Sequence, residues 1–244
     1  MLWKVIALSS FVLLIVLCVL FTLNYFQMKN DETARKLVLA ELLARVDSLE
    51  NSVSQSKGTE LLLKYNLARL SLRMDMLRQK GRYLVIDRHR SHFWVREGDA
   101  IIYEGTCGVG RGKRRFLGKL YDFETPAGKF SIVEKLKNPW WFRPDWFWRE
   151  KGMKVPDKFI QYPPGVTFNE AVAFYNSLSD EDKLRVRAVP GFLGKYALKI
   201  ADGIYIHYGS VRRGPVSHGC IRVSEKDVET LYKLLDEGAP VYVY

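Results

Sequence analysis

Cysteine is scarce in this 244-residue chain, and the scarcity limits how it can be stabilised. The three cysteines are Cys18, Cys107 and Cys220, and the first of them lies within an apolar run. The other two cannot form a disulfide framework, so they make either one bridge or leave at least one free thiol. Repeats and low-complexity tracts are also absent. The hydrophobic content of 48% is sufficient for one sizeable domain with appendages.

Acidic residues are outnumbered by basic ones. The 27 Asp and Glu residues stand against 38 Lys and Arg residues, which gives a formal net charge of +11. This balance favours contact with polyanions such as nucleic acid, anionic lipid or an acidic wall polymer. It serves equally well to keep a membrane-tethered protein soluble. The charge alone therefore selects no partner.

The apolar run near the N-terminus has no cleavage site after it. Residues 5–23 contain only three hydroxyl side chains among apolar ones and reach the roughly 18 residues that a membrane-spanning helix needs. Residues 24–27 are bulky or polar, which does not suit a signal peptidase. A lipoprotein signal is also excluded, because Leu17 precedes Cys18 where a small residue would be needed. We therefore predict an uncleaved transmembrane signal anchor over residues 1–27.

Proline is missing from residues 30–80, and apolar side chains recur there at helical spacing. We predict a helical or coiled-coil stalk over residues 28–80 that allows self-association. The alternative is a helical hairpin folded back on itself, which the glycine in Ser56-Lys57-Gly58 favours. The apolar positions form two series: Leu39, Leu42, Val46, Leu49 and Val53, then Leu61, Tyr65, Ala68, Leu72 and Met76.

From residue 81 to 244 the pattern changes to short strands rich in β-branched and aromatic residues. Few helices interrupt them, which indicates a mainly β domain rather than alternating βαβ units. Thr167 with Glu170 and Ser179 with Asp182 are capping signals for two short helices. They lie in an inserted segment, residues 157–189, that we expect to act as a partly mobile cover over a cleft.

The hexamer Ser217-His218-Gly219-Cys220-Ile221-Arg222 places a cysteine directly after a glycine, at the mouth of a predicted strand. This arrangement can leave the N–H groups of Gly219 and Cys220 to stabilise an oxyanion. A cysteine with a pKa of about 8.5 needs a base to supply thiolate at neutral pH. His207 ends another predicted strand, and a hairpin-type return would bring it beside Cys220. Taken singly, each is equally a buried structural residue.

An ordered series of motifs accompanies this pair. Besides Ile206-His207-Tyr208-Gly209 and the hexamer, the chain contains Thr125-Pro126-x-Gly128-x-Phe130, Leu193-Gly194-x-Tyr196-Ala197-Leu198 and Gly238-x-Pro240-Val241. The series covers residues 82–244 and resembles the catalytic domain of L,D-transpeptidases of the YkuD type. The resemblance implies a mainly β, sandwich-like domain and a cysteine acyl-transferase that acts on peptidoglycan stem peptides.

The resemblance also implies roles for individual residues. Cys220 takes the position of the nucleophile and His207 that of the general base. The backbone carbonyl of Tyr208 orients the base, His218 lines the site, and Gly219 supplies an oxyanion N–H.

Three further side chains are expected to contact the substrate. Ser217 belongs to the signature, and Arg222 suits a substrate carboxylate through its planar fork, with a structural salt bridge as the alternative. Trp141 lies in the aromatic stretch at 139–148, which either walls the cleft or fills the core.

Other features have plainer interpretations. Arg212 and Arg213 either meet acidic groups of the stem peptide or form a solvated turn. The basic loop at 111–119 is interpreted as a solvated face, and Cys107 as a small buried strand residue.

The implied reaction needs neither a metal nor an organic cofactor. Cys220 attacks the carbonyl that precedes a terminal D-alanine, and an amine resolves the resulting thioester. Hydrolysis of the same bonds, as by a carboxypeptidase or endopeptidase, is the first alternative. A zinc site built from His207, His218 and Cys220 lacks an evident fourth ligand, and a wall-binding scaffold is the third alternative.

The substrate sets the expected location. Because peptidoglycan lies outside the cytoplasmic membrane, we expect a single-pass membrane protein with its N-terminus inside and its catalytic domain outside. The expected partners are stem peptides and the membrane, not nucleic acid.

Overall fold

The computed structural model describes residues 2–53, 60–211 and 214–244, without the side chains of residues 2–16, 52, 53 and 61. The chain divides into two compact units, residues 1–77 and 78–244, each of which is described by itself.

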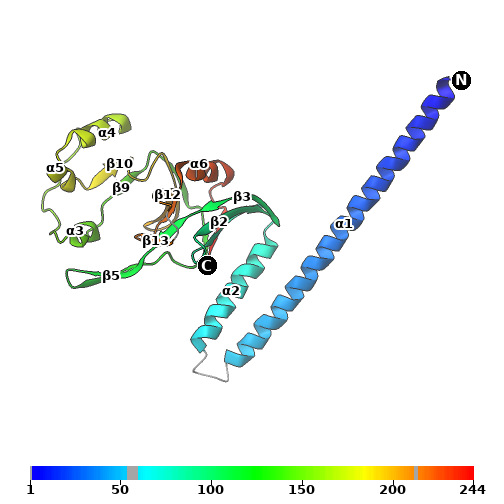
Figure 1. The fold of residues 1–244 in the computed structure, drawn as a ribbon, viewed down its shortest axis with the longest axis horizontal. Coiled ribbons are helices and arrows are strands. Elements are labelled where there is room, and N and C mark those ends of the chain that lie inside the picture. The colour runs from blue at the N-terminus through cyan, green and yellow to red at the C-terminus, as the bar shows by residue number, and fades with distance from the viewer. Residues whose placement is uncertain (1, 54–59, 212–213) are drawn as a thin grey trace. The chain divides into compact units, whose positions relative to one another are not determined.

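The first unit is built from two helices, α1 (Leu2–Val53) and α2 (Glu60–Arg78) (Figure 1). The predicted break at Ser56-Lys57-Gly58 lies outside the described residues. The predicted apolar face of α1 is confirmed for four of its five positions, because the shielded side chains among residues 31–50 are Leu39, Leu42, Val46 and Leu49. The side chain of the fifth, Val53, lies outside the described residues.

The predicted apolar face of α2 is wrong in part. Tyr65 is 47% exposed and Ala68 is also exposed, whereas Leu63, Leu67 and Leu70 are half-buried. The helix carries apolar side chains around most of its circumference, so spacing alone did not select the shielded face.

The apolar run near the N-terminus falls within α1. Over the part of the chain that the structure describes, no helix is long and apolar enough to cross a membrane. The predicted span at residues 5–23 lies mostly among residues whose side chains are outside that description.

The second unit contains two main sheets (Figure 1). The first has the order β3-β2-β1-β15-β7, and the second the order β13-β4-β14-β12-β11-β8. The strands of the first sheet are β1 (Arg82–Asp87), β2 (His92–Glu97), β3 (Ala100–Thr106), β7 (Gly128–Ser131) and β15 (Pro240–Val243). Those of the second are β4 (Gly108–Gly110), β8 (Glu134–Lys137), β11 (Tyr196–Ala201), β12 (Ile204–Tyr208), β13 (Gly214–Ser217) and β14 (Ile221–Val223).

Two small two-stranded sheets and four helices complete the described part of this unit. The first small sheet pairs β9 (Trp140–Phe142) with β10 (Ala188–Pro190), and the second pairs β5 (Gly112–Phe116) with β6 (Lys119–Phe123). The helices are α3 (Trp146–Glu150), α4 (Phe168–Ser177), α5 (Asp180–Leu184) and α6 (Glu225–Leu234).

The hydrophobic core lies between the two main sheets and under α6. It joins Leu84 and Val95 of the first sheet with Ile206 and Ile221 of the second and Leu231 of α6, all of them almost completely buried. The prediction of a mainly β domain preceded by helices is therefore confirmed. Burial of these aliphatic side chains, at about 25 cal/mol per Å² of apolar surface, is the main stabilising contribution.

The predicted short helices form where the caps indicated. Thr167 caps α4 in a complete capping box with Glu170, and Ser179 caps α5 through the Asp182 N–H. Helix α6 begins after Ser224, whose hydroxyl accepts a hydrogen bond from the Asp227 N–H, and it ends at Leu234.

The strand pairing around β12 positions the site. Strands β11 and β12 form an antiparallel hairpin, whereas β12 and β14 are parallel, with His207 opposite Arg222. The expected hairpin-type return to Cys220 is therefore wrong: a crossover leads from β12 to the start of β14. Because β14 begins at Ile221 beside Ile206, Cys220 comes next to Tyr205, two residues before His207 on β12.

Candidate active site

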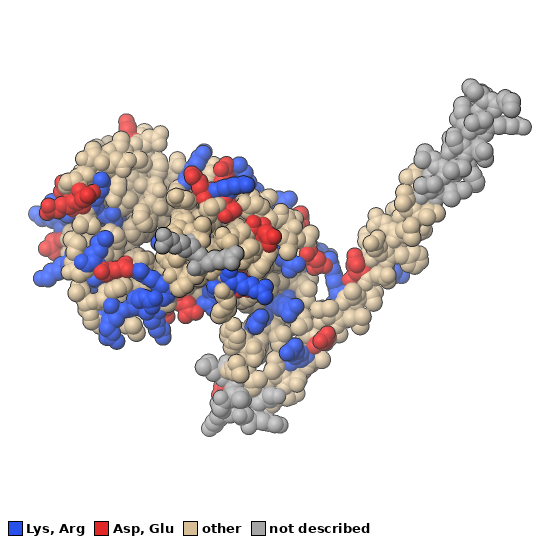
Figure 2. All heavy atoms as spheres, viewed as in Figure 1, with Lys and Arg blue, Asp and Glu red and all other residues tan. Residues whose placement is uncertain are grey.

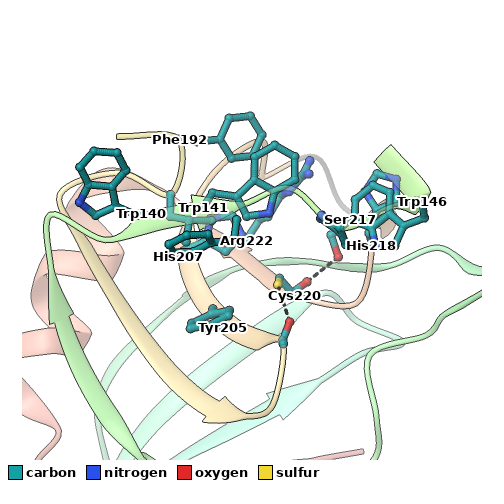
Figure 3. A pocket seen from close by; sticks show the side chains of 14 residues that line it. Trp140, Trp141, Trp146, Phe192, Tyr205, His207, Ser217, His218, Cys220 and Arg222 are labelled. Atoms are coloured by element: carbon teal, nitrogen blue, oxygen red, sulfur yellow. Dashed lines mark hydrogen bonds between the residues drawn. The ribbon is translucent and has the colours of Figure 1, made fainter. Parts of the chain in front are cut away.

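A cavity of about 290 Å³ opens in the second unit at the ends of β12 and β14 (Figure 3). One side of it is made by residues of these strands and of the turn before β14, and the other by an aromatic segment. The lining residues are Trp140, Trp141, Phe142, Pro144, Trp146, Phe192, Leu193, Gly203, Tyr205, His207, Ser217, His218, Cys220 and Arg222. His207 and Cys220, which come from different elements, thus face one space.

The turn that carries Cys220 is held by its own backbone and by Ser217. The Ser217 hydroxyl, almost completely buried, donates to the Cys220 carbonyl (Figure 3) and accepts a 3.2 Å hydrogen bond from the Gly219 N–H. Gly219 has a φ of +114°, and a Cβ there would come within 3.3 Å of Ile204 Cδ1. The turn therefore requires glycine before the cysteine.

A second hydroxyl holds the same turn from outside. The Thr125 side chain, 1% exposed, donates to the Gly219 carbonyl at 2.9 Å and accepts from the Gly110 N–H at 2.8 Å. Thr125 belongs to one of the sequence motifs, but the motif alone assigned it no role. In the structure, its hydroxyl hydrogen-bonds the Cys220 turn and β4 to the segment before β7.

These hydrogen bonds bear on two of the predicted roles, which stay predictions. The Gly219 N–H, expected to face an oxyanion, is engaged by Ser217. The Ser217 hydroxyl, expected to contact substrate, is committed to the turn. A short turn brings its own polar groups together first, so they satisfy each other before any ligand enters.

The Cys220 thiol contacts the backbone at the start of β12. Its Sγ donates to the Gly203 carbonyl at 3.5 Å (Figure 3). Burial raises the pKa of the thiol, although the backbone of Tyr205 and the charge of Arg222 act in the opposite direction. Among the described residues, no hydrogen bond joins this thiol to His207.

His207 is held in one tautomer. Its side chain is buried, and Nδ1 lies 2.7 Å from the Tyr208 carbonyl oxygen. A carbonyl can only accept, so Nδ1 carries the hydrogen and Nε2 of the neutral ring carries the lone pair. Burial lowers the pKa of His207 to about 4, the hydrogen bond to Tyr208 opposes this, and the charge of Arg222 adds to it.

Tyr208 takes part through its backbone, as its predicted role requires. Its side chain is 46% exposed, and its N–H donates to the Leu193 carbonyl at 3.2 Å. A Cβ on Gly194 would come within 2.6 Å of the Tyr208 Cβ. The Leu193-Gly194 motif thus packs on the residue whose carbonyl holds the imidazole.

His218 belongs to a charged cluster that the sequence did not reveal. Its ring stacks on Trp146 with centroids 3.9 Å apart, and its Nε2 lies 2.7 Å from Glu150 Oε2. Arg111 contacts both Glu150 and the same Nε2. Because Arg111 only donates and an ionised Glu150 only accepts, Nε2 can serve one of them at a time.

The charges of this cluster shift one another. Burial alone would raise the pKa of Glu150, but hydrogen bonds from His218 and Arg111 hold it below its ordinary value. Burial lowers the pKa of His218, against the effect of its hydrogen bond to Glu150. The cluster therefore keeps an ionised carboxylate beside the cavity.

Arg222 is half-buried in the cavity lining and donates to the Val216 carbonyl at 3.0 Å. No ion pair of Arg222 occurs among the described residues, so the alternative of a structural salt bridge is not supported. A Cβ on Gly209 would come within 2.8 Å of the Arg222 Cδ, so the glycine makes room for the side chain.

The aromatic stretch forms the wall of the cavity. Trp141 stacks on Phe192 with centroids 4.1 Å apart, and both line the cavity together with Trp140 and Trp146. Trp148, in contrast, is completely buried. Both interpretations of the stretch hold, therefore, for different tryptophans within it.

The expected cover at residues 157–189 lines no described part of the cavity. It packs instead behind the wall: Arg143 donates to the carbonyls of Lys183 and Val186, and Trp148 Nε1 donates to the Leu184 carbonyl at 2.7 Å. These contacts do not test whether the segment moves over the cleft, so that stays a prediction. In the structure, the segment packs against the aromatic stretch that forms one side of the cavity.

Other predicted features lie away from the cavity or outside the description. Arg212 and Arg213 are outside the described residues. Cys107 is completely buried, and burial, followed by the charge of Asp87, raises its pKa to about 12. Among the side chains that the structure describes, no three His, Cys, Asp or Glu residues are grouped to hold a metal ion.

The comparisons with known proteins agree with the motif series. The family profile for the L,D-transpeptidase catalytic domain, YkuD, matches residues 81–243. No curated protein matches the chain.

Solved structures resemble the chain at low identity. A Cys-to-Ser mutant of the Enterococcus faecium L,D-transpeptidase is 16% identical with a TM-score of 0.42, over 68% of this chain and 50% of its own. The L,D-transpeptidase from Xylanimonas cellulosilytica is 16% identical with a TM-score of 0.43, over 72% and 69%. L,D-transpeptidase 3 from Mycobacterium tuberculosis is 18% identical with a TM-score of 0.42, over 67% and 61%. The match thus spans half of the first of these relatives.

Proposed function

The chain belongs, over residues 81–243, to the family of L,D-transpeptidase catalytic domains called YkuD, and on this premise we propose that it is a peptidoglycan L,D-transpeptidase. The observation that carries the proposal is the pairing of Cys220 with an oriented, neutral His207 in one cavity. A neutral imidazole with a free lone pair is what a general base requires.

The proposed first half-reaction acylates Cys220. Nε2 of His207 takes the thiol proton as Sγ attacks the carbonyl carbon between the third stem residue and the terminal D-alanine. When the tetrahedral intermediate collapses, the C–N bond breaks and His207 returns the proton to the leaving amine. A thioester on Cys220 remains.

The proposed second half-reaction transfers the acyl group. An amine of another stem, or of a protein side chain, attacks the thioester, and His207 takes its proton. The C–S bond breaks and the thiolate receives that proton, which regenerates the resting pair. Water in place of the amine would give the hydrolytic alternative.

The oxyanion of both steps needs backbone donors. Because the Gly219 N–H is engaged by Ser217, we assign the role to the N–H of Cys220. That N–H makes no hydrogen bond to another described residue. Arg222, which lines the cavity, is proposed to bind a stem-peptide carboxylate. Trp141 is proposed to pack on the stem peptide that donates the acyl group.

The proposed location follows from the substrate. Peptidoglycan lies outside the cytoplasmic membrane, so the second unit is proposed to lie outside as well, tethered by the apolar run at residues 5–23. Protease treatment of intact spheroplasts checks this: the second unit should be degraded without lysis. Its protection until lysis would contradict the proposed orientation.

Mass spectrometry after exposure to a carbapenem tests the acyl-enzyme. Opening of the β-lactam ring joins its carbonyl carbon to Sγ and breaks the C–N bond without loss of atoms. The expected adduct therefore has the full mass of the compound and maps to Cys220. Cys107, which is completely buried, is the internal control and should stay unmodified.

Two variants sharpen this test. Cys220→Ala should carry no adduct, and Cys220→Ser at most a trace, because a lone histidine does not activate a serine hydroxyl sufficiently. Stoichiometric, tightly bound zinc in the wild type would contradict the proposal.

Incubation with a tetrapeptide donor and an amine acceptor separates transfer from hydrolysis, because the two reactions give different products.

A further inference from the structure

The hairpin of β5 and β6 lies outside both main sheets and is strongly basic. Residues 111–119 contain five basic side chains and no acidic one: Arg111, Lys113, Arg114, Arg115 and Lys119. Figure 2 shows Lys and Arg side chains gathered at the end of the unit where Figure 1 places β5. Apart from Arg111, which reaches Glu150 and His218, these side chains have no role in the proposed reaction.

The tip of the hairpin carries exposed leucines. Leu117 and Gly118 form its two-residue turn, with φ values of +45° and +78°. Leu117 is 59% exposed and Leu120 is 53% exposed. Positive φ is uncommon for a bulky residue, and such turns favour Asn-Gly. Neither the positive φ of Leu117 nor the exposure of its side chain to water stabilises the fold.

The base of the hairpin is stiffened by aromatic rings. The rings of Tyr121 and Phe123 are parallel with centroids 5.8 Å apart, and Phe116 packs on both. Phe123 also contacts the ring of His218 edge-on at 4.7 Å. The hairpin is thus a firm projection fixed to the wall of the cavity, with its leucines at the far end.

We propose that this hairpin tip is a contact for an anionic membrane surface. Leu117 and Leu120 enter the headgroup region, while Lys113, Arg114, Arg115 and Lys119 bind lipid phosphates. Charge complementarity supports an anionic partner. The two leucines favour a bilayer over a soluble polyanion, because only the bilayer offers an apolar phase to receive them. The proposal does not depend on the acyl-transfer chemistry.

Co-sedimentation with lipid vesicles tests it on residues 78–244, which leaves out the apolar run of α1. This fragment keeps the entire core cluster between Leu84 and Val243. It should bind vesicles of equal parts phosphatidylglycerol and phosphatidylcholine, and bind pure phosphatidylcholine far more weakly. Equal binding to both would overturn the proposal.

Leu117→Asn separates folding from binding. Asn suits the positive φ and makes the favoured Asn-Gly turn, so the melting temperature should stay the same or rise. Vesicle affinity should fall about ten-fold through loss of the apolar side chain. Ile101→Asn, at a site that is 53% exposed on β3, is the matched control and should not change binding.

Charge reversal tests the electrostatic part. Arg114→Glu with Arg115→Glu should weaken binding at least about 25-fold, from about five-fold for each basic side chain lost near the surface. Lys158→Glu with Lys226→Glu makes the same change in net charge at exposed sites elsewhere and should have a much smaller effect. Equal losses in both would overturn the proposal. The proposal would also be overturned if Leu117→Asn left both polyphosphate binding and vesicle binding unchanged. That result would identify a soluble polyanion as the partner.

Discussion

At the scale of single residues, the state of His207 decides how the site can react. Its Nδ1 hydrogen is committed to the Tyr208 carbonyl, and its pKa of about 4 keeps the ring neutral at physiological pH. The second histidine of the site, His218, is bound to Glu150 and stacked on Trp146. His207 therefore has a free lone pair on Nε2 that can accept the thiol proton, whereas Nε2 of His218 is engaged by Glu150.

This difference predicts that alanine substitution of the two histidines slows acylation of Cys220 to different extents. His207→Ala should slow acylation of Cys220 by about 10²–10⁴-fold, because the base that takes the thiol proton is removed. His218→Ala should cost much less, since the Arg111–Glu150 pair remains. The measurement is the rate of carbapenem adduct formation, with melting temperature as the control for folding. Equal losses in two folded variants would mean that the roles are assigned wrongly.

The same histidine predicts how stability depends on pH. Its folded pKa, about 4, lies below the unfolded value of about 6.5. As the pH falls from 6.5 to 4, the unfolded state gains the proton first, so the free energy of unfolding falls; above 6.5 this contribution is fully present. The loss amounts to about 3 kcal/mol at most. Denaturant titrations of wild type and His207→Asn should show a shallower acid dependence in the variant, and parallel curves would contradict the buried, neutral state.

At the scale of elements, Arg143 joins the aromatic wall to the segment behind it. It is 6% exposed, donates to the carbonyls of Lys183 and Val186 and to the Tyr175 hydroxyl, and lies 4.3 Å over the Phe147 ring. A surface arginine in the same region, Arg187, pairs with Asp145 in an exposed ion pair.

These two arginines predict a matched pair of outcomes. Arg143→Ala should lower the free energy of unfolding by about 2–4 kcal/mol, because buried carbonyls lose their donor. Arg187→Ala should cost less than about 1 kcal/mol, as exposed ion pairs do. Urea denaturation measures both. A small effect at Arg143 would mean that residues 157–189 are attached to the wall by other contacts.

At the scale of the whole molecule, the two units differ in what they bury. All members of the core cluster lie between Leu84 and Val243, whereas the first unit's buried apolar side chain among the described residues is Leu42. The second unit therefore contains what its fold needs.

Removal of the first unit is predicted to leave a folded, reactive protein. Residues 78–244 should melt cooperatively and form the carbapenem adduct at a rate within about two-fold of the full chain, because no residue of the cavity is lost. Analytical ultracentrifugation should show a monomer if self-association belongs to residues 30–80. An unfolded fragment would contradict the assignment of the core.

Local signals in the sequence determined much of this protein. Helix caps and the alternation of strands act over a few neighbouring residues, so they were readable without the fold. Strands of three or four residues, such as β4 and β9, were missed because so short a run shows no alternation. The ordered motifs around His207 and Cys220 identified the family for the same reason, since each motif is contiguous.

Only the tertiary structure decided how the site is shared among distant residues. Glu150 and Arg111 reach His218 across 68 and 107 positions of the chain, a pairing that no local pattern encodes. The engagement of the Gly219 N–H by Ser217 and the place of residues 157–189 behind the wall also depend on packing. In each case the sequence supplied the chemical groups, and burial, which takes away competing water, determined which of them meet.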